Sequence, residues 1–308
     1  MYHKEIEIDY RFERLYCCFF YLILVKLRGM FLFAFIAACI YAFNEILGKY
    51  IADKNSEPLL VGILINFYAL CISLIFSLFQ PIHYVLDSRI ILGLISAGLI
   101  YALGTFTYYY SLKLCPISEF TLLTRASVVL IALGGVLIFK DPFTPLQILG
   151  GLLIIAGSIV ISWRGRWILF HKGSLLALLT AFLFAVGALI DKSLVNNFSA
   201  AVYQVISYFL MTIFLLPSFY FLFKTSKKFP SKKSQVMIFI SAFCFASAGF
   251  FLLKAYQSAG LVSYVNLITQ LRIPIVVVYG LLVFHEKERI FNKLLAVVLI
   301  ILGTYFIH

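Results

Sequence analysis

The chain has 308 residues, of which 63% are hydrophobic and only 12% are charged, and its mean hydropathy is +1.03. This composition excludes an ordinary soluble domain and indicates a protein embedded in a membrane. The net charge of +12 does not indicate nucleic-acid binding, because Lys and Arg gather at the ends of apolar segments and in short loops, where a membrane surface attracts them.

The first 28 residues precede the regular part of the sequence. They begin with the polar stretch MYHKEIEIDYRFER and continue with LYCCFFYLILVKL, which is apolar but only 13 residues long. That is too short to span a membrane, and no small-residue cleavage site follows it. We expect an N-terminal tail with an interfacial helix over residues 1–28; an over-extended start of the reading frame is the alternative.

Ten apolar segments follow, each about as long as a helix that crosses a membrane. The hydrocarbon layer is about 30 Å thick and needs about 20 apolar residues of helix, because unpaired backbone groups are not tolerated in lipid. The predicted transmembrane helices cover residues 29–50, 58–80, 89–111, 116–139, 145–163, 171–193, 199–222, 234–256, 261–284 and 290–307.

The pattern of the sequence repeats after 143 to 145 residues. The aligned positions include small residues of the first and sixth segments, Ala34, Ala38 and Ala42 with Ala177, Ala181 and Ala185. Alanines at four-residue intervals let helices approach closely in lipid, so both helices should lie deep in the bundle. Each half has five spans, and because five is odd, the second half must enter from the opposite face. We therefore expect an all-α polytopic membrane protein with ten transmembrane helices in two inverted five-helix repeats, residues 29–163 and 164–308.

Three stretches of the first half are the most distinctive: YAFNEILGKY at 41–50, YYYSLKLCPISEFTLLTRAS at 108–127 and FKDPFTPLQILGGLLIIAGSIVIS at 139–162. They resemble a repeat of the EamA family of the drug/metabolite transporter superfamily, and the resemblance extends over residues 30–308. It implies two inverted repeats, a central cavity, alternating access, and small metabolites or drugs as cargo. The second half departs from the pattern at 284–303, which keeps the acidic residue but lacks the Thr-Pro and the paired Gly.

Two arginines lie deep in corresponding spans, Arg125 in the fourth and Arg272 in the ninth. A charge there costs about 2.5–3.5 kcal/mol on insertion scales, so it needs a partner or a hydrated cavity. Polar residues recur beside them at helical spacing: Thr121, Thr124, Asn266, Thr269 and Gln270. This pattern predicts a hydrated cavity suited to a carboxylate or phosphate of the cargo. The alternative is that each arginine binds a protein carboxylate or helix carbonyls and holds the bundle together.

Glu45 lies in the last third of the first span, beside Asn44 and one turn above Tyr41. We expect these three residues to line the same cavity. A desolvated carboxyl group can carry a proton, so Glu45 is a candidate for coupling transport to H⁺. The alternative is an ion pair with Lys49, four residues further along the same helix face.

Lys49 and Lys192 close their helices at matched positions of the repeat, and Asp191 accompanies the second lysine. A lysine at a helix end favours the helix dipole and extends toward the interface. Its recurrence in both halves suggests a gate contact as the alternative.

Motifs for catalysis and for metal or nucleotide binding are missing from the sequence. We therefore expect no enzyme activity, no cofactor and no metal. Lys and Arg are more numerous on the face opposite the start of the first helix, which places that face inside, whereas the family resemblance implies cytoplasmic termini. The orientation stays open.

These patterns together predict a monomeric, multi-pass protein of the cell (inner) membrane, which binds a small-molecule substrate and the lipid bilayer but no nucleic acid. The expected function is secondary active transport of small organic solutes, with efflux of amino acids or related metabolites as the first expectation. An uptake carrier or exchanger for a charged metabolite such as a nucleotide derivative is the alternative. A membrane-embedded lipid-modifying enzyme is a more distant one, because no acid/base or nucleophile set is apparent.

Overall fold

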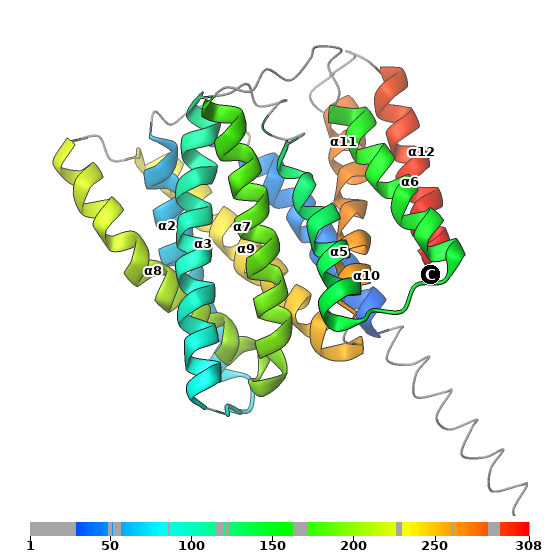
Figure 1. The fold of residues 1–308 in the computed structure, drawn as a ribbon. Helices are drawn as coiled ribbons and strands as arrows, with labels where there is room; N and C mark the ends of the chain where they lie inside the picture. The colour runs from blue at the N-terminus through cyan, green and yellow to red at the C-terminus, as the bar shows by residue number, and fades with distance from the viewer. Residues whose placement is uncertain are drawn as a thin grey trace, which may run out of the picture.

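The computed structural model describes residues 29–48, 51, 57–85, 87–114, 120, 123–162, 172–225, 230–259, 261–282 and 290–307. The predicted interfacial helix within residues 1–28 lies outside this set. The described residues form helices and connecting turns, and the extended pairing among them is one isolated antiparallel bridge between Tyr84 and Phe198 (Figure 1).

The helices follow the predicted segments closely. The first described helix covers residues 29–48 and is the blue, unlabelled helix of Figure 1. The rest of the first half contains α2 (Pro58–Leu78), α3 (Ser88–Leu114), α5 (Ala126–Phe139) and α6 (Pro145–Ser162). The second half contains α7 (Lys172–Leu194), α8 (Ala200–Thr225), α9 (Lys232–Ala259), α10 (Val262–Ile268), α11 (Arg272–Leu282) and α12 (Ile290–Ile307).

Six helices of the described chain are long and apolar enough to cross a membrane. They cover Gly29–Gly48, Leu59–Leu78, Ser88–Ser111, Lys172–Asn197, Ala200–Tyr220 and Lys232–Ser258. Four further apolar helices are shorter: Ala126–Phe139, Pro145–Gly157, Val262–Val278 and Ile290–Phe306. The fold is therefore all-helical and membrane-embedded, with the short helices confined to the fourth, fifth, ninth and tenth predicted segments.

The fourth and ninth segments were predicted as continuous helices, and the structure interrupts the ninth. A 3₁₀ turn over Thr269–Leu271 separates α10 from α11. Pro274 explains the interruption, because its ring cannot donate to the carbonyl of Gln270 four residues earlier. In the fourth segment, residues 123–124 are helical, Arg125 forms a turn, and α5 begins at Ala126.

The last helix of each half packs against the other, α6 on α12 (Figure 1). A Cβ atom on Gly157, near the end of α6, would lie 2.9 Å from the backbone oxygen of Ala296, near the start of α12. A Cβ atom on Gly303, near the end of α12, would lie 2.5 Å from the backbone oxygen of Gly150, near the start of α6. The two helices are therefore antiparallel, and they approach so closely that only glycine fits at both positions.

The small-residue stripes of the first and sixth segments are buried, as predicted. The exposed fractions are 0% for Ala34, Ala38 and Ala42, and 0%, 1% and 2% for Ala177, Ala181 and Ala185. The helix of residues 29–48 and α7 therefore pack their alanine faces against neighbouring helices, whereas their other faces carry exposed side chains such as Phe35 and Phe182. From this position they present Glu45 and Asp191 to the neighbouring helices.

Candidate functional site

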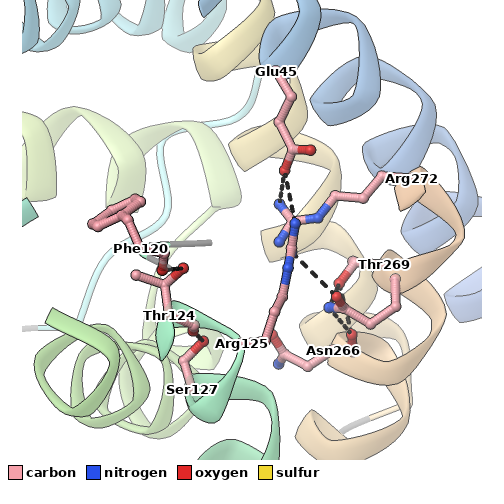
Figure 2. Close-up of polar contacts among 9 residues, drawn as sticks. Glu45, Phe120, Thr124, Arg125, Ser127, Asn266, Thr269 and Arg272 are labelled. Carbon is pink, nitrogen blue, oxygen red and sulfur yellow. Dashed lines mark hydrogen bonds and ion pairs between the residues drawn. The ribbon is translucent and has the colours of Figure 1, made fainter. Parts of the chain in front are cut away.

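The two deep arginines meet at a single carboxylate. Arg272 Nη1 lies 3.2 Å from Glu45 Oε1, and Arg125 Nη2 lies 3.8 Å from the same oxygen. Figure 2 shows the two guanidinium groups approaching Glu45 from different helices. We call Tyr41, Glu45, Arg125, Gln270 and Arg272 the arginine cluster.

Two contacts complete the arginine cluster. Arg125 Nη1 donates to Gln270 Oε1 at 3.4 Å, and the guanidinium carbon of Arg272 lies 5.7 Å from the centre of the Tyr41 ring. Such a cation–π contact adds about 0.5–2 kcal/mol, depending on how dry the site is. The cluster thereby joins the first helix, the fourth segment and the ninth.

The charges of the arginine cluster do not balance. Two guanidinium groups share one carboxylate, so the formal charge of the cluster is positive. Arg272 Nε is buried and has no hydrogen-bond partner in the described chain. The side chains are 16% exposed for Arg125, 22% for Arg272 and 34% for Glu45, so the cluster is not fully buried. A buried donor without an acceptor, next to excess positive charge, fits an oxyanion of a ligand.

The arginine cluster lies where both helices are irregular. Thr124 and Thr269 occupy matched positions of the repeat, and each hydroxyl bonds back to its own helix: Thr124 Oγ1 donates to Phe120 O at 2.9 Å, and Thr269 Oγ1 donates to Asn266 O at 2.7 Å. Such back-bonding competes with the backbone ladder and bends helices. At these interruptions, the side chains of Arg125 and Arg272 both point toward Glu45 Oε1.

The structure does not bring every predicted cavity residue to the arginine cluster. Asn44 points toward α9, where its Oδ1 accepts a hydrogen bond from Ser241 Oγ at 2.6 Å. Asn266 Nδ2 donates to the hydroxyl of Tyr256 at 2.8 Å and so faces α9 as well. Thr121 lies outside the described residues.

Of the predicted helix-end residues of the second half, Lys192 is buried and Asp191 is half-buried. Lys192 is 6% exposed, and its Nζ donates to the backbone oxygen of Tyr256 at 3.1 Å, so it does not extend to the membrane surface. Asp191 accepts hydrogen bonds from the hydroxyls of Tyr101 and Tyr203, each at 2.6 Å. Lys49, the counterpart of Lys192, lies outside the described residues.

Residues of the FKDPFTP stretch hold the start of the ninth segment, a role that the sequence analysis did not predict. Asp141 is 5% exposed, and its Oδ2 accepts a hydrogen bond from the backbone N–H of Ser263 at 3.0 Å, in the first turn of α10. Tyr264 donates its hydroxyl proton to the backbone oxygen of Pro142 and stacks on Phe143, with ring centres 4.6 Å apart. The stretch thus fixes the helix that leads to Arg272.

A protein-family model of the EamA-like transporter family matches the chain twice, over residues 28–163 and 171–308. The chain belongs to this family. A solved structure described only as "Crystal structure of protein" is similar to it, with a TM-score of 0.73, 16% identity and a match over 91% of this chain and 96% of that one. At this identity the similarity concerns the fold alone. A search of the curated proteins finds no match.

Membership in the EamA-like family makes this chain a transporter of the drug/metabolite type, built from two EamA repeats. The arginine cluster draws Glu45 and Arg125 from the first repeat and Gln270 and Arg272 from the second. The arginine cluster therefore links the two repeats through an ion pair and a hydrogen bond.

Proposed function

We propose that this chain is a secondary active transporter that exports small organic anions or zwitterions, amino acids or related metabolites, by alternating access. The observation that carries the proposal is the unbalanced charge of the arginine cluster, where two guanidinium groups share one carboxylate and Arg272 Nε has no acceptor among the described residues. A carboxylate of the substrate would supply the second anion and the missing acceptor. Glu45 would then hold the arginines in place while the site is empty.

The proposed arrangement is ten transmembrane helices in two inverted five-helix repeats. Each of the six long and four shorter apolar helices overlaps one of the ten predicted segments, which supports this count. Antiparallel packing of α6 on α12, which are equivalent helices of the two repeats, supports the inversion. Arg125 and Gln270 are 145 residues apart, the interval of the sequence repeat, so their contact would lie on the pseudo-two-fold axis.

The matched interruptions at Arg125 and at Thr269–Leu271 support alternating access about this axis. Discontinuous helices at the interface of two repeats are where many secondary transporters bind their cargo. Rocking of one repeat against the other would open the arginine cluster to each side in turn. We place the protein in the cell (inner) membrane as a monomer.

Ligand stabilisation of the purified protein tests the substrate class. The probes are the standard L-amino acids and, for each, its carboxamide, which keeps the side chain and the amino group but lacks the carboxylate. We expect some amino acids to raise the melting temperature and their amides to have no effect, because only the acid can occupy Arg272. Stabilisation by nucleoside monophosphates instead would favour the exchanger for nucleotide derivatives, since a guanidinium pair also binds phosphate. Equal effects of acid and amide would contradict recognition by the arginines.

A further inference from the structure

A second acidic centre, half-buried, lies on α7, apart from the arginine cluster. Asp191 Oδ2 accepts a hydrogen bond from the hydroxyl of Tyr101 on α3, and Asp191 Oδ1 accepts one from the hydroxyl of Tyr203 on α8, both at 2.6 Å. Distances this short are typical of bonds from a hydroxyl to a charged carboxylate. Asp191 therefore joins three helices, one of which belongs to the other repeat.

The sequence builds this centre with a glycine one turn before the acid. A Cβ atom on Gly187 would lie 2.7 Å from the ring of Tyr101, so the bare backbone of α7 lets this ring lie against the helix. Because Gly187 and Asp191 are four residues apart, they share a helix face, and the hydroxyl of Tyr101 reaches the carboxylate. Tyr203 is 1% exposed and contacts Phe198, which fixes its direction.

No cation of the described chain neutralises the carboxylate of Asp191. Within the described chain, no Lys, Arg or His forms an ion pair with Asp191, and Lys192 beside it turns toward Tyr256 on α9. Among the described residues, the titratable groups that face Asp191 are tyrosines: Tyr101 on α3, Tyr203 and Tyr208 on α8, Tyr256 on α9, and Tyr41 on the first helix. An uncompensated carboxylate in a membrane interior is costly, and binding a proton removes that cost.

We propose that Asp191 is the proton-binding site of this transporter and that the proton driving solute exchange binds there. This inference rests on the proposed transport function. Glu45, the other candidate carrier, keeps its ion pairs with Arg125 and Arg272 only while it is ionised, whereas Asp191 has no ion pair with any described residue to lose. The proton site and the arginine cluster are then separate. Asp191 lies on α7 and Glu45 on the first helix, which are the equivalent helices of the two repeats.

The proton step has a defined effect on the hydrogen bonds. A proton from the aqueous phase binds one carboxylate oxygen, which becomes a hydroxyl and can no longer accept from its tyrosine in the same geometry. One phenol must then reorient, and the remaining bond becomes neutral and about half as strong. Because Tyr101 belongs to the first repeat and Asp191 to the second, protonation weakens a link between the repeats. Release of the proton restores both bonds.

A proton fits this centre better than a metal cation. A metal cation needs several oxygen ligands, whereas the described polar groups that contact Asp191 are two phenol hydroxyls, and both donate their protons to it. Within the described residues, no group of three or more His, Cys, Asp or Glu could hold a metal ion. The proposal therefore predicts dependence on a pH gradient and none on a Na⁺ gradient.

Infrared difference spectroscopy of the full-length protein in liposomes tests the site without any substrate. On lowering the pH, we expect a band of a protonated carboxyl group in the wild type that is lost in Asp191→Asn. Asp87→Asn, which removes an exposed loop carboxylate, is the matched control and should keep the band, as should Glu45→Gln. A band that persists in Asp191→Asn or disappears in Glu45→Gln would overturn the assignment.

Transport measurements in the same liposomes test the coupling, with the amino acid that stabilises the protein most as probe. Asp191→Asn should lose accumulation driven by a pH gradient, at least tenfold, while counterflow of the probe without a gradient continues. Tyr101→Phe leaves the carboxyl group of Asp191 and its infrared band in place, but it should lower the accumulation of the probe driven by a pH gradient severalfold. Unchanged gradient-driven accumulation in Asp191→Asn, or accumulation driven by Na⁺ at equal pH, would refute the proposal. Absence of counterflow in the wild type would instead contradict the proposed transport function, and the infrared result would still decide the proton site.

Discussion

Replacing Glu45 by glutamine removes the carboxylate that the two arginines share. The ion pairs, at 3.2 and 3.8 Å, have Coulomb energies of about 5 and about 4 kcal/mol at an effective dielectric constant of 20. Breaking a fully buried pair costs about 3–5 kcal/mol, and an exposed pair contributes about 0–1 kcal/mol. Since the side chain of Glu45 is 34% exposed, we expect a value between these limits, about 1–3 kcal/mol.

The assay is thermal unfolding of the purified protein in detergent. In chains of similar size, each kcal/mol lowers the melting temperature by roughly 2–4 °C, so Glu45→Gln should melt several degrees below the wild type. Its two arginines lack an internal anion, so added sulfate should stabilise this variant more than the wild type. The double variant Glu45→Gln with Arg272→Gln should recover part of the loss, because it removes the uncompensated charge as well.

The control for this prediction is Asp87→Asn, which removes a carboxylate at the exposed start of α3 and should melt like the wild type. If Glu45→Gln melts like the control and responds to sulfate no more than the wild type does, the arginine cluster is not held by Glu45. The reasoning from charge balance would then be refuted.

Three further outcomes follow from the contacts around the site. Gly157→Ala should lower the free energy of unfolding by about 1–3 kcal/mol, because the new Cβ would lie 2.9 Å from a backbone oxygen of α12. Gly48→Ala, whose new Cβ would have nothing within 4 Å, should leave the stability unchanged. Thermal unfolding monitored by fluorescence compares the two variants. Asp141→Ala should lower the free energy of unfolding by about 1–3 kcal/mol, because it leaves the backbone N–H of Ser263 unpaired, and Asp141→Asn should lower it less. Equal losses of stability in thermal unfolding of the two variants would contradict this. Pro274→Ala should regularise the ninth segment and slow solute counterflow at unchanged melting temperature, and a rate equal to the wild type would argue against a role for the interruption.

The general fold could be predicted from the apolar segments and their repetition, because a membrane restricts the structures that such segments can form. Backbone groups must be paired in lipid, so apolar segments of this length are helices, and alanine stripes such as Ala34 and Ala38 are buried between them. The 3₁₀ turn at Thr269–Leu271 had a signal in Pro274, but a proline predicts a kink without giving its geometry. The turn at Arg125 has no such signal.

Part of the arginine cluster could also be predicted from the sequence. Deep charges such as Arg125 and Arg272 are costly wherever they lie, so they can be recognised along the chain. The carboxylate that the two arginines share cannot be recognised in this way, because Glu45 is far from both in sequence. Helical spacing offers only Lys49 as a partner of Glu45, and Lys49 lies outside the described residues. The tyrosines around Asp191 were missed for the same reason, since Tyr101 is 90 residues away from it.

Solute counterflow in liposomes, compared between the wild type, Arg272→Gln and Arg89→Gln, tests the central claim most directly. Arg89 is exposed at the start of α3, so Arg89→Gln controls for the loss of one arginine. We expect the wild type and Arg89→Gln to exchange a carboxylate-bearing solute, and Arg272→Gln to bind it roughly tenfold more weakly or worse, because a charge-assisted hydrogen bond contributes about 1.5–3 kcal/mol. Equal affinity and equal exchange in all three proteins would contradict the account of the arginine cluster as an anion-binding centre.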